Sequence, residues 1–237
     1  MPDAPYFTPE LLVFLRQLRR NNNREWFARN KTRYEQVVRD PALNFIAGFA
    51  PLLRQISPHF VADPRPTRGS LFRIYRDTRF AADKRPYKTH VGIHFFHGSV
   101  KNAATPAVAK PAPAATVHAP VFYLHLEPEN CFAAAGIWHP DYRAVTRVRA
   151  AIVRNPEQWG KVRRKLELEG DCLSKAPRGY DANHPFIEDI KQKDFVCSVA
   201  FTDAQISRAK FMRDFYAACR NMTPLVEFVT KALDLKF

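Results

Sequence analysis

The sequence predicts an α+β fold with a mainly antiparallel sheet flanked by N-terminal and C-terminal helices. Apolar residues recur at helical spacing towards both ends of the chain, whereas several central segments alternate or are rich in β-formers. Consecutive strands without intervening helices are typical of α+β proteins and not of alternating βαβ units. The 237 residues can bury a large core, and we expect one domain over residues 1–237.

Helices are expected first. Thr8 is a hydroxyl N-cap with proline after it, and the apolar stripe that follows is Leu11, Leu12, Phe14, Leu15 and Leu18. A second helix is expected after Asn23 as its cap, and a third from Asp40. Pro51 lies within the apolar stripe of the third helix and indicates a kink or a restart.

The middle of the chain is expected to supply the sheet. The predicted strands span residues 70–76, 89–97, 120–127 and 131–137. Residues 99–119 are rich in Ala and Pro and have no apolar period. We interpret them as a flexible excursion that joins two strands of a hairpin.

The remaining elements are mostly helical. Helices are predicted over residues 140–154 and 156–169, and one more strand over 195–201. Two further helices, near 203–220 and 223–233, are expected to close the chain.

The chain is strongly basic. It has 37 Lys and Arg against 23 Asp and Glu, a net charge of +14. Such a charge attracts nucleic acid, anionic lipid head groups and phosphorylated metabolites. The alternative is a charge spread over solvated faces, because it is not gathered into one long Lys/Arg run.

Cysteine usage and the absence of sorting signals bear on location. The four cysteines form no Cys-x-x-Cys pair and no zinc-ribbon spacing, so we expect reduced thiols in a reducing compartment. There is no signal-peptide pattern, and no apolar run approaches the roughly 18 residues that span a bilayer. We therefore expect a cytoplasmic protein without membrane insertion.

The strongest site candidate is a central segment dense in charged and aromatic residues. Its candidate ligand-binding residues are Arg73, Tyr75, Arg76, Arg79, Asp83, Lys84, Tyr87 and Lys88, with Asp77 as an acid/base candidate. Guanidinium groups hold carboxylate or phosphate in bidentate fashion. Two interpretations stay open: a site for an anion, or an internal ion-pair network that ties this segment to the helices.

Strand periodicity indicates a second group. If the predicted strands pair, one face of the sheet is apolar and the other gathers Tyr123, His125 and Glu127 together with His90 and His94. His125 and Glu127 are acid/base candidates on that face. The alternative is a polar face that is simply exposed to solvent. Imidazole and carboxylate groups can also bind metal, but no His-x-x-x-His helix or Cys pair supports such a site, and we predict none.

A loop rich in turn residues supplies further candidates. Gly179 indicates a turn, and loops on a rigid scaffold often carry binding residues. The candidates are Arg178, Tyr180 and Asp181 as ligand-binding residues and His184 as an acid/base group. Alternatively, Asp181 or Asn183 caps a short helix that begins at Pro185.

Four segments together resemble a known family. RIYRDTRFAADKRPYKTHVGIHF (Arg73–Phe95) closely resembles the signature of the uncharacterised bacterial and fungal domain-of-unknown-function 2461 family, and the segments Arg16–Glu35, Phe122–Asp141 and Ala176–Phe195 resemble its other blocks. The resemblance covers nearly the whole chain. It implies motif boundaries but no mechanism. The chain departs from the family at Ala133-Ala134-Ala135-Gly136, where a run of glycines is usual, and in an excursion longer than the usual loop.

No P-loop, Gly-x-Gly-x-x-Gly turn or Gly-x-Ser-x-Gly elbow is present. The leading hypothesis is a pocket for an anionic ligand, phosphorylated or carboxylated, in a protein that can also be an enzyme. The alternatives are a nucleic-acid-binding module that uses the basic surface and a non-catalytic scaffold held by ion pairs. No motif indicates a cofactor or an oligomeric state.

Overall fold

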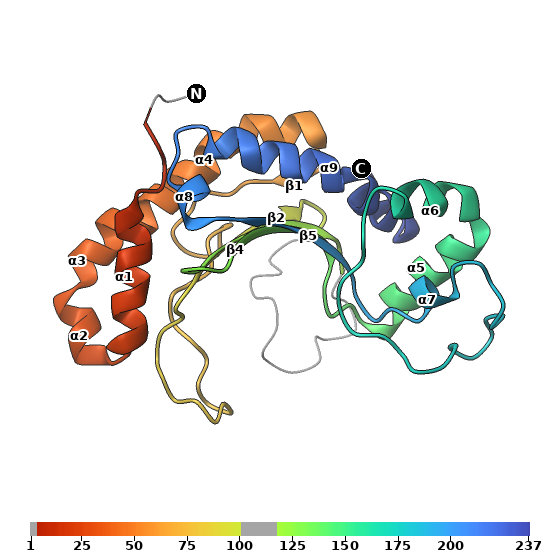
Figure 1. Cartoon of the computed structure of the whole chain (residues 1–237), viewed down its shortest axis with the longest axis horizontal. Coiled ribbons are helices and arrows are strands. Elements are labelled where there is room, and N and C mark those ends of the chain that lie inside the picture. The colour runs from red at the N-terminus through yellow and green to blue at the C-terminus, as the bar shows by residue number, and fades with distance from the viewer. Residues whose placement is uncertain (1–3, 101–117) are drawn as a thin grey trace.

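The computed structural model describes residues 4–100 and 118–237. Five antiparallel strands form one sheet in sequence order (Figure 1). They are β1 (Phe60–Val61), β2 (Val91–His97), β3 (Val121–Leu126), β4 (Cys131–Ile137) and β5 (Phe195–Phe201). The α+β class with N-terminal and C-terminal helices is confirmed.

Helices precede, interrupt and follow the sheet. The N-terminal set is α1 (Pro9–Arg20), α2 (Arg24–Arg29), α3 (Lys31–Tyr34), the π-helical turn η1 (Glu35–Arg39) and α4 (Asp40–Ile56). The later set is α5 (Tyr142–Arg154), α6 (Pro156–Arg163), α7 (Ile187–Ile190), α8 (Asp203–Ile206) and α9 (Phe211–Ala232). Asn23 caps α2 as predicted, since its side-chain oxygen accepts a hydrogen bond from the Trp26 amide at 2.9 Å. Helix α4 continues through Pro51.

The long helices α4 and α9 cover one face of the sheet (Figure 1). The Phe49 ring lies 4.7 Å from that of Phe95 in β2 and 4.9 Å from that of Phe215 in α9, so it joins both helices to the sheet. Each aromatic pair contributes about 1 kcal/mol beyond area burial. On β4, Ala133 and Ala135 are fully buried against this helical layer, where small side chains let α9 approach closely.

Gly136 ends this stretch of β4 in a conformation that requires glycine. Its φ is +125°, and a Cβ there would lie 2.0 Å from the carbonyl oxygen of Phe195. Any side chain would therefore break the pairing of β4 with β5.

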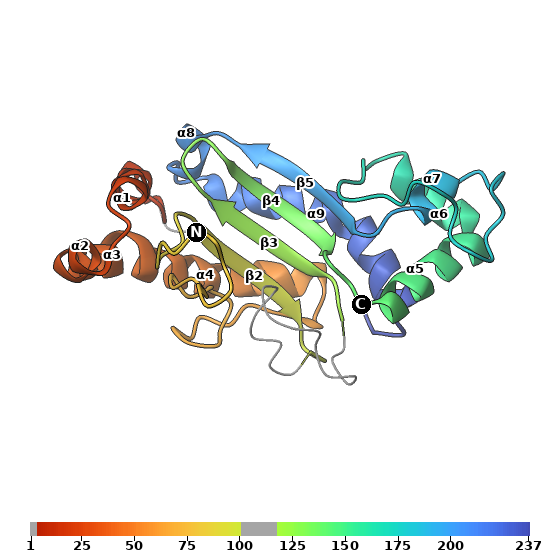
Figure 2. The ribbon, with the colours of Figure 1, turned by 90° about the horizontal axis from the view of Figure 1, so that it is seen from below.

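In the part of the chain that the structure describes, no helix covers the opposite face, which Figure 2 shows from below. We call it the open face. The strand register places Gly92 opposite His125, His125 opposite Phe132, and His94 opposite Tyr123. The two-faced sheet predicted from alternation is confirmed. The solvent interpretation is wrong for two of the histidines, because His94 is 7% and His125 9% exposed.

Residues 70–76 are not a regular strand, contrary to the prediction. Leu71 forms a bridge with Ile93 in β2, but Tyr75 forms one with Tyr87. The segment changes its pairing partner within a few residues, so a continuous ladder cannot form. The structure also adds β1, which the sequence did not predict.

Two helix predictions need correction. The helix predicted over residues 156–169 ends at Arg163, because the chain turns to pair Glu169 with Val196 of β5. The two predicted closing helices are instead the short α8 and a continuous α9 that passes through Pro224. Buried apolar residues on both sides of Pro224 hold the helix together despite the missing amide.

Residues 101–117, most of the predicted Ala/Pro-rich excursion, lie outside the described residues. The excursion does join β2 to β3, which are antiparallel neighbours, as predicted. The single-domain organisation stays a prediction. None of the helices described is both long and apolar enough to cross a membrane.

Candidate functional site

The loop between β1 and β2 is built from a repeated local motif. In each case an aspartate accepts hydrogen bonds from both the backbone amide and the guanidinium of the arginine two residues later. The three copies are Asp63-Pro64-Arg65, Asp77-Thr78-Arg79 and Asp83-Lys84-Arg85. We call them the Asp-x-Arg turns. Hydrogen bonds from Arg79 lower the pKa of Asp77 to about 2, so this carboxylate is a poor base.

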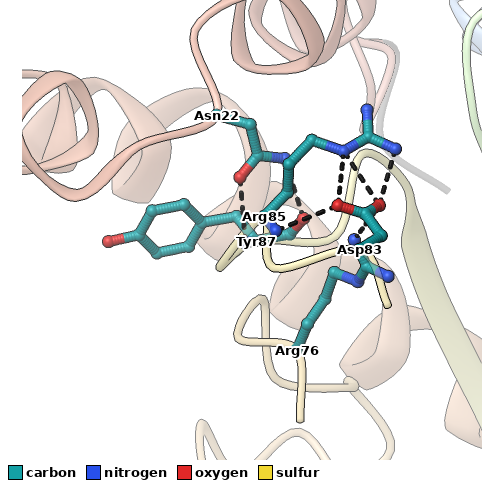
Figure 3. A network of polar contacts seen from close by, with 5 residues as sticks. All are labelled: Asn22, Arg76, Asp83, Arg85 and Tyr87. Atoms are coloured by element: carbon teal, nitrogen blue, oxygen red, sulfur yellow. Dashed lines mark hydrogen bonds and ion pairs between the residues drawn. The ribbon is translucent and has the colours of Figure 1, made fainter. Parts of the chain in front are cut away.

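A second arginine joins one of these turns. Arg76 Nη1 lies 2.6 Å from Asp83 Oδ2, so Asp83 binds Arg76 and Arg85 together (Figure 3). Hydrogen bonds from Arg85 and then Arg76 hold the pKa of this carboxyl far below its usual range. Most of the predicted arginine cluster is therefore neutralised within the loop.

The N-terminal helices hold the end of the loop. The Asn22 side chain makes two hydrogen bonds to the backbone of Tyr87, at 2.9 and 3.0 Å (Figure 3). The Tyr87 ring stacks on Phe27 at 4.1 Å. The predicted ligand residue Tyr87 is thus an anchor, 4% exposed. Tyr75 is more exposed, with its ring 5.4 Å from that of Tyr87.

Two predicted cations differ from the others. Among the described residues, Arg73, Lys84 and Lys88 form no ion pair. Lys84 still donates to the Thr78 carbonyl at 3.1 Å, whereas the side chains of Arg73 and Lys88 have no hydrogen-bond partner there. Lys88 is half-buried, with its ammonium 5.3 Å from the Phe72 ring centre. Burial and the neighbouring charge of Arg73 lower the pKa of Lys88.

Hydrogen bonds link three side chains in a row on the open face. Tyr123 Oη lies 3.0 Å from His125 Nδ1, and His125 Nε2 lies 3.3 Å from Glu127 Oε2. Because a carboxylate only accepts, the hydrogen on His125 is assigned to Nε2, and Tyr123 then donates to Nδ1. Asn130 also donates to Glu127, at 3.2 Å. We call Tyr123, His125 and Glu127 the relay.

Burial sets the protonation of the relay and its neighbour His90. Burial, His125 and Lys88 lower the pKa of His90 to about 4, and burial lowers the pKa of His125 as well. Burial raises the pKa of Tyr123 far above its usual value. Burial also acts to raise the pKa of Glu127, but hydrogen bonds from Asn130 and His125 leave it lowered overall. At neutral pH two neutral imidazoles therefore lie beside a neutral phenol and a carboxylate.

The loop and the relay meet at His90 and Gly92. The His90 ring stacks on His125 at 4.6 Å, and the charges of Lys88 and Arg76 help to lower the pKa of His90. A Cβ on Gly92 would lie 2.7 Å from the Phe72 ring and 2.8 Å from Tyr123 Oη. Glycine at this position therefore lets the loop lie against the relay.

A pocket of about 320 Å³ opens along β4 and β5 beside the relay. Its lining includes Phe132, whose ring stacks on His125 at 4.7 Å, and Asn130, which contacts Glu127. Ser198 in the same pocket donates to Glu169 at 2.6 Å. The relay residues themselves are not part of the pocket lining, but Phe132 and Asn130 each contact both the relay and the pocket.

The loop with Arg178 and His184 lies elsewhere. Figures 1 and 2 both show residues 170–190 beside α5, α6 and α7, at the opposite end of the sheet from the β1–β2 loop. The Asp181 carboxylate accepts from the Asn183 amide at 2.9 Å, and His184 Nδ1 from the Phe186 amide at 3.1 Å. The structure does not bring these residues to the central segment.

The expected helix after this loop also starts later. It begins at Ile187 and not at Pro185, and no side chain caps it. The hydrogen bonds of Asp181 and His184 close turns before the helix, so the capping alternative is wrong too.

The sequence reasoning missed several residues that build the site. Tyr123 was placed on the right face but not recognised as a member of the relay, and Asn22, Phe72 and Asn130 were not among the candidates. The Asp-x-Arg spacing was a readable signal, because an aspartate side chain commonly closes a turn two residues on. In the described part of the chain, no three His, Cys, Asp or Glu side chains are grouped to hold a metal ion.

A family model described as "Conserved hypothetical protein (DUF2461)" matches residues 10–228. The chain belongs to this family. The matched DUF2461 region contains the Asp-x-Arg turns, the relay and all five strands. No curated protein matches the sequence significantly. The three alanines of β4 lie on different faces of the sheet: Ala133 and Ala135 pack under α9, whereas Ala134 lies opposite Tyr123 on the open face.

Proposed function

We propose that the open face and the end of the β1–β2 loop bind a small anionic ligand, phosphorylated or carboxylated, and present it to the relay for acid–base chemistry. The observation that supports this most directly is that some cations of the loop have carboxylate partners and others do not. Arg76, Arg79 and Arg85 have aspartate partners, whereas Arg73 and Lys88 have none within the described residues. Of these two, Lys88 is close enough to His90 to lower its pKa, and Arg73 is close enough to Lys88 to lower the pKa of that ammonium.

The energetics of Lys88 favour an anion. A half-buried ammonium has lost part of its hydration, and among the described residues Lys88 contacts the Phe72 ring face but pairs with no carboxylate. An oxyanion between Lys88 and Arg73 would restore the lost stabilisation, and the planar guanidinium can bind two of its oxygens.

The relay supplies the candidate chemistry. His125 is neutral at pH 7, and a hydrogen bond to the Glu127 carboxylate orients its ring. A histidine held by a carboxylate in this way is also the general base of catalytic triads. We assign the acid–base role to His125 and Glu127 rather than to Asp77, which Arg79 neutralises, or His184, which lies near α7. A cytoplasmic location stays part of this proposal.

The test is titration calorimetry with inorganic phosphate, citrate and a panel of phosphate monoesters. Wild type is compared with Lys88→Met and Arg73→Gln, and Arg79→Gln is the matched control from the same loop. We expect saturable binding that weakens about tenfold when a charged hydrogen bond is lost at Lys88 or Arg73. Equal weakening by Arg79→Gln, or no binding to wild type, would contradict the proposal.

A further inference from the structure

Another cation without an ion-pair partner among the described residues lies in α5, away from the β1–β2 loop. Arg149 in α5 is only 6% exposed, and its Nε has no hydrogen-bond partner among the described residues. The Nη2 of Arg149 donates a hydrogen bond to the carbonyl of Gln192, at 2.9 Å. Burial lowers the pKa of Arg149, as expected for a guanidinium that has lost hydration and has no carboxylate beside it.

The buried carboxylates of this region are already engaged. Asp189 accepts from Trp159 Nε1 at 2.7 Å and pairs with Arg163 at 2.9 Å. Asp194 accepts from the His139 amide at 2.6 Å. Within residues 4–100 and 118–237, no acidic side chain pairs with Arg149. A buried guanidinium without a counter-charge is costly, and natural proteins normally pair it.

Two phenols accompany Arg149. Tyr142 precedes it by two helical turns, so both lie on one face of α5. Tyr180 reaches the same place from the loop before α7, and the three groups are close enough to influence one another's ionisation. In the described part of the molecule neither phenol hydroxyl has a hydrogen-bond partner, and Tyr142 is 80% exposed.

We propose that Arg149, Tyr142 and Tyr180 form a second anion site, specific for a small oxyanion such as a phosphate monoester or a carboxylate. Guanidinium and phenol groups are all donors, which suits an acceptor-only ligand. The buried amide oxygen of Gln192 also lacks a partner, so a ligand with a hydroxyl group beside its oxyanion fits best. This site does not depend on the β1–β2 loop, because α5 and that loop lie at opposite ends of the sheet (Figure 2).

The test measures the thermal unfolding midpoint during separate titrations with inorganic phosphate, glycerol phosphate and phosphoglycolate. Phosphoglycolate has no hydroxyl group and is compared with glycerol phosphate, which has two. All variants carry Lys88→Met, so that binding at the open face is weakened about tenfold and is the same in every comparison. We expect phosphate to raise the unfolding midpoint of this parent and Arg149→Met to abolish the rise. Because Met removes an uncompensated buried charge, Arg149→Met in chloride buffer should unfold no earlier than the parent.

Arg143→Met is the matched control, since Arg143 is an exposed arginine of the same helix and should leave the phosphate response intact. If Arg149→Met fails to fold, Tyr180→Phe decides, because it removes one hydroxyl only; we expect several-fold weaker phosphate binding. A parent that does not respond to these anions, or an unchanged response in Arg149→Met or Tyr180→Phe, overturns the proposal and leaves Arg149 as a structural group that water solvates.

Discussion

At the scale of single residues, burial decides the charge of the histidines on the open face. His94 is 7% exposed, and burial lowers its pKa to about 4. Its Nε2 lies 3.3 Å from the Gly69 carbonyl, a contact that acts in the opposite direction but does not restore the normal pKa. The folded protein therefore holds this imidazole neutral at pH values where an unfolded chain would protonate it.

The sign of the resulting pH dependence follows directly. Between the unfolded pKa near 6.5 and the folded pKa of about 4, the unfolded state binds more protons, so stability falls as pH falls. His94 alone should cost about 2 kcal/mol of unfolding free energy between pH 7 and pH 5. Urea unfolding at both pH values checks this, with His94→Gln as the comparison. A variant that loses as much stability as wild type would show that His94 is not responsible.

At the scale of elements, the β1–β2 loop owes its position to the end of α1. Asn22 pairs through its side-chain amide with both backbone groups of Tyr87, as a neighbouring strand would. The loop then continues through Lys88 and His90 to β2. The anchor thus fixes the backbone next to Lys88 and three residues before His90, whose ring stacks on His125 of the relay.

Asn22→Ala should therefore act on stability and on the site together. It leaves two backbone groups of the buried Tyr87 without partners, which costs about 1–3 kcal/mol. We expect that loss in chemical unfolding, together with faster amide exchange in residues 73–88 and weaker anion binding. Asn21→Ala, next to it but exposed, is the control. If the two variants behave alike, the anchor has no special role.

The elements also show where sequence reasoning succeeds. Strands 131–137 and 195–201 were predicted with their observed bounds, because alternation or β-rich content marks a ladder that runs without interruption. Residues 70–76 looked similar but divide their pairing between two partners, which no local pattern reveals. A break between two closing helices was predicted at residues 220–223, yet tertiary burial on both sides of Pro224 lets α9 continue through this region.

The candidate site divides in the same way. Composition located the segment 73–88, and alternation located His125 and Glu127 on one face. Neither could tell that Arg79 and Arg85 are paired locally while Lys88 is not, since that depends on how the loop turns. The sequence could not tell whether the loop containing Arg178 lies near the central segment, because only tertiary packing determines which end of the sheet a loop adjoins.

At the scale of the whole molecule, the net charge of +14 supports the alternative of nucleic-acid binding. Contacts of that kind release counterions, so affinity falls by on the order of a thousandfold or more between about 50 and 200 mM salt. A small anion held between two cations in a partly buried site depends less on salt.

We therefore expect any oligonucleotide binding to be salt-sensitive and unaffected by Lys88→Met. The affinity for phosphate or citrate should fall less than about tenfold between 50 and 200 mM salt, and it should depend on Lys88. Fluorescence anisotropy and calorimetry across a salt series measure both. Oligonucleotide binding that persists at high salt and disappears in Lys88→Met would favour nucleic acid as the ligand of this site.

The strand order has a consequence for how the chain acquires its structure. Each strand pairs only with its neighbours in sequence, but the distances along the chain differ greatly: β3 and β4 are separated by residues 127–130, whereas β4 and β5 are separated by residues 138–194. Closing the longer loop costs more conformational entropy. The β3–β4 hairpin can nucleate the sheet from local contacts, and β5, with the pocket it borders, is completed only after α5, α6 and α7 have emerged and folded back.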